Sequence, residues 1–223
     1  MKPIALIVGG SSGIGKAICH RLKDEYQVIN MSRRKNDEVE NIYINVEEYE
    51  SVKDSFSFCV EKYSKPEILI YSAGWVQPEH LLEIEPEIWQ KQINVNLTGA
   101  FYVTKMFVKV CDKPQSSNEK KIIYISSTAG MRSSPGWSAY SSSKSGLINF
   151  AGTMSDELKQ YNIKVYCISP GRCNTPLRKI LCPTENGNLI MQPEEPARVV
   201  EFLLKQGNSL DGQNIVVREN KGY

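Results

Sequence analysis

Short apolar runs alternate with longer amphipathic segments along the whole chain. The apolar runs are short and rich in β-branched side chains, which is typical of buried strands. The predicted strands are Ile4–Val8, Gln27–Met31, Asn41–Val46, Ile68–Tyr71, Lys121–Ser126, Ile163–Ser169 and Asn214–Val217. Between them apolar residues recur at helical spacing, so that Val52, Phe56 and Val60, for example, share one helix face. The predicted helices are Ile14–Leu22, Ser51–Tyr63, two in succession within Glu79–Asp112, Ser138–Tyr161 and Glu194–Lys205.

This alternation of strands with helices predicts the fold class. A strand, a helix and a further strand form a right-handed crossover unit, and successive units build a parallel sheet covered by helices on both faces. The predicted fold is therefore α/β and doubly wound. The chain has no internal repeat, and we interpret Lys113–Lys121 as a loop after a helix rather than as a domain boundary. We expect one domain over residues 1–223.

Composition excludes several other classes of protein. The hydrophobic share of 41%, the charged share of 23% and the formal charge of +2 are ordinary for a globular protein, and give no reason to expect a nucleic-acid or membrane partner. The run Ile4–Val8 is too short to span a bilayer and leads directly into glycines, without the pattern of a signal peptide. The six cysteines are scattered, which predicts no metal site and no disulfide framework. We expect a cytoplasmic protein with reduced thiols.

The segment Gly9-Gly10-Ser11-Ser12-Gly13-Ile14-Gly15 follows the first strand and opens the first helix. Glycines at this place permit a tight turn and let the backbone approach a pyrophosphate, while the helix N-terminus supplies N–H donors, as in Rossmann-type folds. The alternative is that the glycines only pack the helix against the strand. The position in the chain favours a dinucleotide, with Gly9, Ser11, Ser12, Gly13, Ile14 and Gly15 as candidate contacts.

The end of the second predicted strand indicates which dinucleotide binds. A carboxylate there would bind the ribose 2′-hydroxyl of NAD, whereas an arginine accommodates the 2′-phosphate of NADP. The sequence has Ser32-Arg33-Arg34, with no carboxylate before Asp37. A guanidinium can bind the phosphate through paired hydrogen bonds. We therefore predict NADP(H) in preference to NAD(H), with Arg33 as the main contact, although a solvated turn would have the same composition and NAD(H) stays possible.

Tyr140 and Lys144 are four residues apart in a predicted helix and share one face. A free tyrosine has a pKa near 10, and a nearby ammonium is expected to lower this value, which would make Tyr140 an acid–base catalyst. Ser127 follows a predicted strand, at the sheet edge where ligands bind in such folds. The alternatives are a surface Tyr–Lys pair and a loop serine bonded to its own backbone.

Several motifs in order resemble the short-chain dehydrogenase/reductase family over nearly the whole chain. They are Gly9-x-x-x-Gly13-Ile14-Gly15, Ala73-Gly74, Asn96-Leu97-Thr98-Gly99, Ile125-Ser126-Ser127, Tyr140-x-x-x-Lys144 and Pro170-Gly171. The resemblance implies an active-site tetrad of Asn96, Ser127, Tyr140 and Lys144. In it tyrosine is the acid–base, serine orients the substrate, lysine tunes the tyrosine and holds the nicotinamide ribose, and asparagine anchors a water.

The same resemblance implies further contacts and an assembly. Asn45 and Val46 would meet the adenine, while Ala73 and Gly74 would lie along the cofactor. Pro170, Gly171 and Thr175 would lie near the nicotinamide carboxamide. Residues 174–193 would form a mobile substrate lid, and a homodimer or homotetramer is expected. Trp75, Met131 and Trp137 are candidate walls of the substrate pocket or core residues, and Arg178 and Lys179 are candidate contacts for an anionic substrate or a solvated charge pair.

Some positions depart from the family pattern. Val8 stands in place of a threonine, Tyr71-Ser72 in place of two asparagines, and Asn45 in place of an aspartate, so that cofactor contacts must be replaced or lost.

The predicted function is an NADP(H)-dependent oxidoreductase interconverting a carbonyl and a secondary alcohol. The alternatives are a 3-oxoacyl-thioester reductase and a catalytically idle NAD(P)-binding sensor or scaffold; enoyl reduction is disfavoured by the Tyr–Lys spacing.

Overall fold

Seven parallel strands form one sheet within residues 2–111 and 119–219, the part of the chain that the computed structural model describes. The strands are β1 (Ile4–Val8), β2 (Gln27–Met31), β3 (Glu40–Ile42), β4 (Ile68–Tyr71), β5 (Lys120–Ile125), β6 (Ile163–Pro170) and β7 (Asn214–Val217). Their order across the sheet is β3-β2-β1-β4-β5-β6-β7. The chain therefore builds outward from β1 to β3 and then returns to the other side of β1. In such folds ligands bind where the direction reverses, here between β1 and β4.

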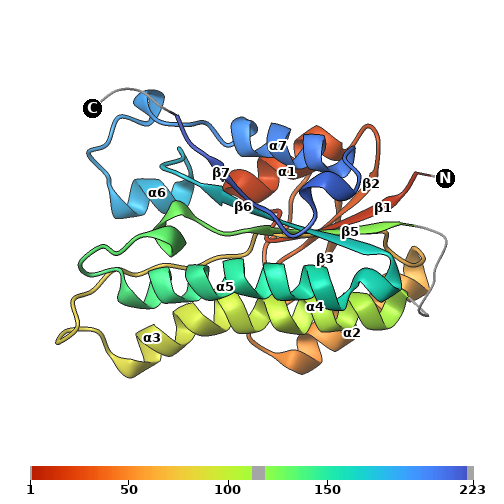
Figure 1. Ribbon diagram of the computed structural model, residues 1–223, viewed down its shortest axis with the longest axis horizontal. Coiled ribbons are helices and arrows are strands. Elements are labelled where there is room, and N and C mark those ends of the chain that lie inside the picture. The colour runs from red at the N-terminus through yellow and green to blue at the C-terminus, as the bar shows by residue number, and fades with distance from the viewer. Residues whose placement is uncertain (1, 112–118, 220–223) are drawn as a thin grey trace.

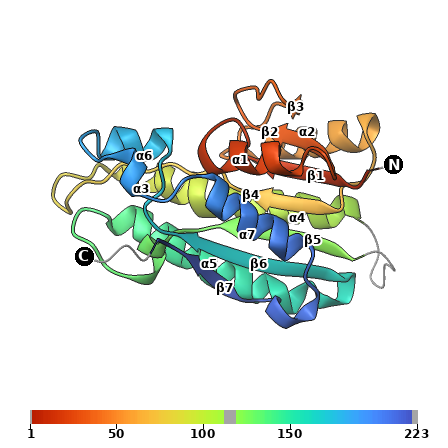
Figure 2. The ribbon, with the colours of Figure 1, turned by 90° about the horizontal axis from the view of Figure 1, so that it is seen from above.

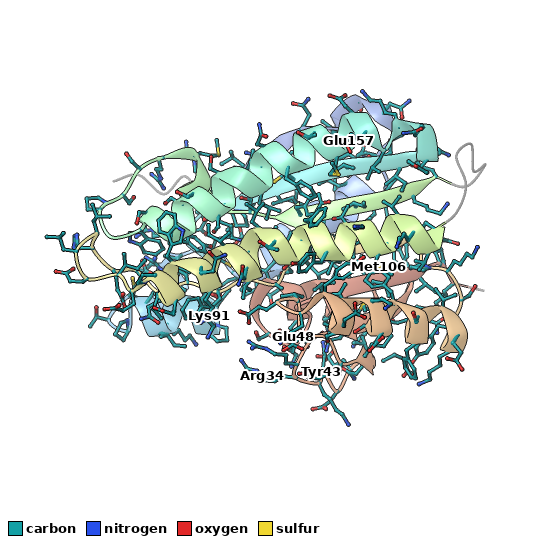
Figure 3. The ribbon with its side chains drawn as sticks, turned by 90° about the horizontal axis from the view of Figure 1, so that it is seen from below. Arg34, Tyr43, Glu48, Lys91, Met106 and Glu157 are labelled. Carbon is teal, nitrogen blue, oxygen red and sulfur yellow. The ribbon has the colours of Figure 1, made fainter. Side chains whose placement is uncertain are left out.

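Helices cover both faces of the sheet (Figures 1 and 2). They are α1 (Gly13–Leu22), α2 (Tyr49–Lys62), α3 (Pro86–Ile93), α4 (Gly99–Cys111), α5 (Ser138–Glu157), α6 (Pro176–Leu181) and α7 (Glu194–Leu204). α1 and α7 pack on one face, and α2, α4 and α5 lie side by side on the other (Figure 3). The doubly wound α/β prediction is confirmed.

The apolar core consists of two layers, one on each face of the sheet. In β1, Ile4, Leu6 and Val8 belong to the layer under α2, α4 and α5, whereas Ala5 and Ile7 belong to the layer under α1 and α7. All five of these residues are buried, because alternate side chains of a central parallel strand point to opposite covered faces. This double burial explains why the strands were visible in the sequence as continuous apolar runs.

Two predicted boundaries were wrong, and one turn was not predicted. The strand predicted over Asn41–Val46 ends at Ile42, because Ile42 pairs with Met31, the last residue of β2, and β3 is the edge of the sheet. Residues 79–85 are not helical, and α3 begins at Pro86, a residue favoured at the first helical position. Between α3 and α4 the chain forms one π-helical turn, Asn94–Thr98, which the sequence analysis did not predict.

Two other predictions concern segments after α4 and after β6. Lys120 and Lys121 belong to β5, whereas Asp112 and most of the predicted loop Lys113–Lys121 lie outside the described residues. The short helix α6 was missed in the predicted lid region; Thr175 caps it, accepting a hydrogen bond from the Arg178 backbone N–H.

In the part of the chain described here, no helix is both long and apolar enough to cross a bilayer.

Candidate active site

The glycine turn between β1 and α1 packs closely against the sheet. Gly9 has a φ of +87°, a conformation that favours glycine, and a Cβ there would lie 2.6 Å from the backbone nitrogen of Ala73. A Cβ on Gly15 would collide with the carbonyl oxygen of Gly9. Both glycines are therefore needed for packing, which brings the N-terminus of α1 to the carboxyl ends of β1 and β4. Ser12, the N-cap residue, makes no side-chain cap hydrogen bond.

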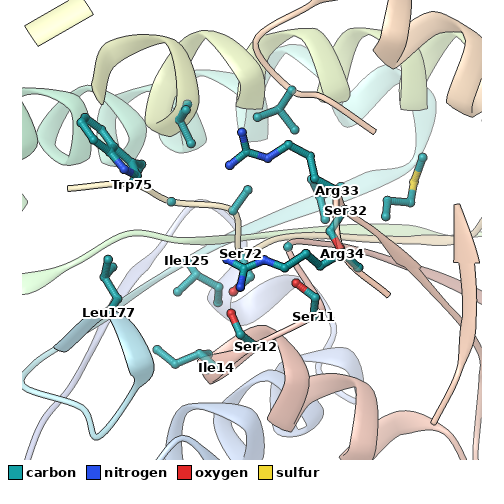
Figure 4. Close-up of a pocket in the computed structure, with 18 of the residues that line it drawn as sticks. Ser11, Ser12, Ile14, Ser32, Arg33, Arg34, Ser72, Trp75, Ile125 and Leu177 are labelled. Atoms are coloured by element: carbon teal, nitrogen blue, oxygen red, sulfur yellow. The ribbon is translucent and has the colours of Figure 1, made fainter. Parts of the chain in front are cut away.

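A cleft opens above this turn, at the reversal point of the sheet (Figure 4). Among the residues that line it are most of the predicted cofactor contacts: Gly9, Ser11, Ser12, Gly13, Ile14, Ser32, Arg33, Arg34, Asn45, Val46, Ala73, Gly74, Tyr140, Lys144 and Thr175. Gly15 is not among the lining residues, because it lies beneath the turn as a packing residue. Pro170 and Gly171 line an adjoining cavity instead.

Asparagines join the Arg33–Arg34 loop to the glycine turn. The side-chain amide of Asn36 donates to the carbonyl oxygen of Gly10 at 2.9 Å, and its backbone N–H donates to Asn41 Oδ1 at 2.8 Å. Asn30 donates to the carbonyl oxygen of Arg34 at 3.0 Å and to Asn41 at 2.8 Å. Asn30 and Asn36 are buried, and the sequence analysis singled out none of the three asparagines. The cluster holds the loop at a fixed position beside the turn.

Arg33 and Arg34 extend from this loop in different directions (Figure 4). Arg33 Nη1 lies 4.0 Å from Glu47 Oε2, and the Arg33 side chain is 59% exposed. Glu47 also lines the cleft and was missed in the sequence, because only the fold brings the chain after β3 beside the end of β2. The loop therefore presents two guanidinium groups, one of which lies close to a carboxylate.

Ser127, Tyr140 and Lys144 come together at the carboxyl end of β5. Ser127 follows this strand and accepts a hydrogen bond from the Ala129 N–H at 3.1 Å, which is the local bond considered in the sequence analysis. Its side chain is also close enough to Tyr140 to affect the pKa of that residue. On α5, Lys144 Nζ donates to the carbonyl oxygen of Ile125 at 3.0 Å and lies 5.7 Å from the centre of the Tyr140 ring.

The pKa of Tyr140 differs from the expectation that an ammonium would lower it. Burial raises the pKa of Tyr140 to about 12, and the nearby Ser127 side chain opposes this shift. Burial also lowers the pKa of Lys144 to about 8, because an ammonium is poorly solvated there. Desolvation therefore dominates at both groups, and Tyr140 is protonated in the cofactor-free protein at neutral pH. This is the form required to donate a proton.

Asn96 lies behind the cleft in the π-helical turn. It is buried; its Oδ1 accepts from the Trp75 N–H at 2.8 Å, and its Nδ2 donates to the Trp75 carbonyl oxygen at 2.8 Å and to Ser143 Oγ at 3.0 Å. A Cβ on Gly74 would lie 3.5 Å from Asn96 Oδ1 and 3.7 Å from Lys144 Nζ, so both groups approach the same glycine. Asn96 belongs to neither cavity lining, unlike the other three members of the implied tetrad.

Tyr71 occupies the position where the family pattern has an asparagine. It is fully buried, and its hydroxyl donates to the Val95 carbonyl oxygen at 2.5 Å. Val95 belongs to the π-helical turn that contains Asn96. A Cβ on Gly99 would lie 2.6 Å from the Tyr71 hydroxyl, so Gly99 makes room for this contact. The departure thus replaces the asparagine contact with a tyrosine that holds the π-helical turn. The next residue, Ser72, lines the cofactor cleft.

A second cavity adjoins the cleft and shares Tyr140 with it. Ser127 and Trp137 line this cavity, as does Arg178. Of the other candidate wall residues, Trp75 lines the cofactor cleft instead, and Met131 is 54% exposed and outside both linings. Lys179 is also outside both linings. This second cavity is called the substrate cavity below.

Comparisons with known proteins agree with this geometry. A family model described as short chain dehydrogenase matches residues 3–186. The chain is 31% identical to a 3-oxoacyl-[acyl-carrier-protein] reductase of Synechocystis sp., over 90% of this chain and 88% of that protein. It is 29% identical to the corresponding reductase of Thermotoga maritima, over 92% of each.

Among solved structures, a variant of actinorhodin polyketide ketoreductase crystallised with NADPH has a similar fold. It superposes with a TM-score of 0.86 at 23% identity, over 97% of this chain and 95% of that chain. The family match and the relatives span nearly all the elements that form the cleft. The chain therefore belongs to the short-chain dehydrogenase/reductase family and is an oxidoreductase that interconverts a carbonyl and an alcohol.

Proposed function

We propose that the protein is an NADP(H)-dependent carbonyl reductase or alcohol dehydrogenase in which Tyr140 is the acid–base. One observation carries the proposal: Tyr140 lines both cavities, and Ser127 lines the second of them close to Tyr140. A substrate in the second cavity would meet its proton donor at the place where the cofactor cleft begins.

The cleft residues fit a dinucleotide. The first turn of α1 opens into the cleft with its N–H groups uncapped by Ser12, which suits a pyrophosphate, and Lys144 can reach a ribose hydroxyl from its place beside Ile125. When bound, the nicotinamide supplies a hydride to the carbonyl carbon. Ser127 orients the substrate oxygen, and Tyr140 transfers its proton to that oxygen, so the carbonyl becomes an alcohol; the reverse reaction returns the proton to Tyr140. Asn96 would hold a water beside Gly74 and Lys144, since its Oδ1 and Lys144 Nζ approach the same glycine.

NADP(H) is favoured over NAD(H) by charge at the end of β2. Arg33 and Arg34 both line the cleft there, Ser32 adds a hydroxyl, and the carboxylate Glu47 lies near Arg33. Two guanidinium groups against one carboxylate favour a 2′-phosphate. The fold neighbour crystallised with NADPH supports the same assignment.

A 3-oxoacyl-thioester reductase is the second candidate, because two relatives covering about nine-tenths of the chain have this activity in their names. Residues 174–193 would form the substrate lid in either case. α6 in this segment contributes Leu177, Arg178 and Leu181 to the substrate cavity.

We include in the proposal a cytoplasmic location, which the free cysteines support. We also include a homodimer or homotetramer that forms through α4 and α5, where Phe101 of α4 is exposed.

Replacing the proton donor tests the mechanism. We expect Tyr140→Phe to lower kcat about 10²- to 10⁴-fold, because it removes the transferable proton and leaves the ring. NADPH binding, measured by fluorescence, is expected to stay nearly unchanged. Tyr161→Phe, in the short 3-10 turn that follows α5, is the matched control and should keep full activity. Retained turnover in Tyr140→Phe would contradict the mechanism, and tight NADPH binding without turnover of any ketone, acyl thioester or sugar would favour the sensor alternative.

A further inference from the structure

Three arginines from separate segments converge on the substrate cavity. Arg132 follows the turn after β5, Arg172 follows β6, and Arg178 belongs to α6. No aspartate or glutamate is among the residues that line this cavity in the described part of the chain. The whole protein carries a formal charge of only +2, so a general excess of basic residues does not account for this concentration.

One carboxylate neutralises part of this charge. Glu185 accepts two hydrogen bonds from Arg178, at 2.6 and 2.8 Å, and one from Arg172 at 3.2 Å. The Arg178 hydrogen bonds, together with the charges of both arginines, hold the pKa of Glu185 below its usual value, so it is ionised at neutral pH. The ion pair between Arg178 and Glu185 is bidentate and mostly buried, whereas Arg172 is 67% exposed and makes a single contact with Glu185. Glu185 therefore fixes Arg178 in place and leaves an excess of positive charge.

Arg132 contributes to that excess. It is exposed, lines the cavity, and has no ion pair or hydrogen bond that fixes its side chain among residues 2–111 and 119–219. The remainder of the cavity is largely apolar, with Val76, Trp137 and Leu177 in its lining. Apolar walls, a reactive end at Tyr140 and Ser127, and an unneutralised guanidinium together indicate the composition of a ligand: a carbonyl, an apolar stem and an anion.

We propose that the physiological substrate carries an anionic group, a carboxylate or a phosphate, and that Arg132 recognises it with Arg172 as the second cation. This inference rests on the proposed function and adds the charge class of the substrate. A guanidinium binds either anion through paired hydrogen bonds, and in a cavity with apolar walls such a contact is stronger than at an open surface. The anion is either part of the substrate itself or part of the phosphate-bearing arm of a thioester carrier.

Matched substrates separate these sources. 4-Oxopentanoate and its methyl ester differ by one charge on the substrate, and 3-oxobutyryl-coenzyme A and 3-oxobutyryl-N-acetylcysteamine differ by the phosphates on the carrier arm. In at least one pair we expect kcat/KM for the anionic member to exceed that of the neutral member about tenfold. The advantage is expected to fall as salt rises, because screening acts on the charged substrate alone.

Arg132→Gln is expected to remove most of that advantage, by lowering kcat/KM for the anionic member of the pair far more than for the neutral member. Lys179→Gln is the matched control, since Lys179 is an exposed cation near the cavity but outside its lining, and it should leave the ratio unaltered. Equal kcat/KM within both pairs, or an equal loss for both members of a pair in Arg132→Gln, would overturn the inference.

A binding measurement keeps this inference separate from the proposed function. Calorimetric titration of 4-oxopentanoate and its ester into the protein saturated with NADP⁺ does not depend on turnover. Tighter binding of the acid that is lost in Arg132→Gln supports the anion site even if no carbonyl is reduced, in which case the proposed reaction alone fails. Equal affinity within this pair, and equally within the thioester pair titrated in the same way, in a protein that reduces other ketones, leaves the reaction standing and removes the anion site.

Discussion

At the scale of the residue, burial has a larger effect on Tyr140 and Lys144 than their charges have on each other. The spacing of Tyr140 and Lys144 predicted a shared helix face, and both side chains reach the same end of β5. Their pKa values depend on burial, which the spacing does not reveal: burial raises the pKa of Tyr140, opposite to the expectation, and lowers that of Lys144. Asn36 and Glu47 were missed for a related reason, since each becomes important only through a neighbour distant in the chain.

Cofactor preference is tested at the same scale. The double variant Arg33→Ala/Arg34→Ala is expected to weaken NADPH binding about 10- to 100-fold, because a phosphate dianion loses its guanidinium partners, while NADH binding changes little. The two single variants, assayed by fluorescence titration, show which arginine contributes more. Lys35→Ala is the control, as Lys35 is adjacent and exposed but outside the cleft lining. NADH binding as tight as NADPH binding, unaffected by these changes, would refute the preference.

At the scale of the element, the π-helical turn Asn94–Thr98 is the least predictable feature. A π-turn shifts the hydrogen-bond pattern of a helix and often marks a functional site. The apolar pattern of the sequence predicted two successive helices but not the turn that joins them, because the turn is stabilised by contacts from elsewhere, including the Tyr71 hydroxyl on Val95. We expect Tyr71 to position Asn96 by holding this turn.

A pair of tyrosines separates positioning from general stability. Tyr71 and Tyr124 are neighbours across β4 and β5, both fully buried, and the Tyr124 hydroxyl pairs with Thr104 on α4, outside the π-turn. Tyr71→Phe is expected to lower kcat about tenfold with little change in the KM for cofactor, since a small misplacement of an active-site group costs rate. Tyr124→Phe should lose a comparable amount of thermal stability and keep its kcat. Equal kcat in the two variants would show that Tyr71 is merely structural.

At the scale of the whole molecule, the sequence predicted most of the fold. Every sheet strand of the described chain overlaps a predicted one. The central strands are the clearest, because they are buried on both faces and so appear as apolar runs. The errors lie at the edge of the sheet and in the segment before α3. There, the hydrophobic pattern does not decide where an element begins or ends. β3 ends where its pairing with β2 ends, and α3 begins at a proline.

Buried thiols make stability sensitive to alkaline pH. Burial raises the pKa of Cys59 to about 11 and those of Cys19, Cys167 and Cys173 to about 12, from a usual value of 9.0. Above pH 9 the unfolded chain releases these protons and the folded protein keeps them. The thiols therefore contribute their full stabilisation below pH 9. Above pH 9 the free energy of unfolding falls as pH rises, by up to about 1.4 kcal/mol per thiol per pH unit. Lys144 has the opposite effect, because its pKa is lowered to about 8 from the usual 10.5. Between these pH values the unfolded chain keeps this proton and the folded protein releases it, so the free energy of unfolding rises with pH.

Urea unfolding at pH 8 and pH 10 under reducing conditions measures this balance. We expect lower stability at pH 10, and a smaller difference between the two pH values in Cys59→Ala. Val52→Ala, buried on the same helix, should lose the same amount at both pH values because it removes no titrating group. A wild-type stability that is constant or rises from pH 8 to pH 10 would show that the thiols do not dominate.

The asparagine link between the Arg33–Arg34 loop and the glycine turn has a consequence for coenzyme engineering. Asn36 ties the loop to Gly10, and Asn30 ties Arg34 to the sheet, so the loop keeps its path whatever side chains it carries. Exchanging the arginines alone would remove affinity for one coenzyme without creating a site for the other. Residues 30–41 should instead be exchanged together, so that the asparagines that fix the loop are replaced along with the residues that determine coenzyme specificity.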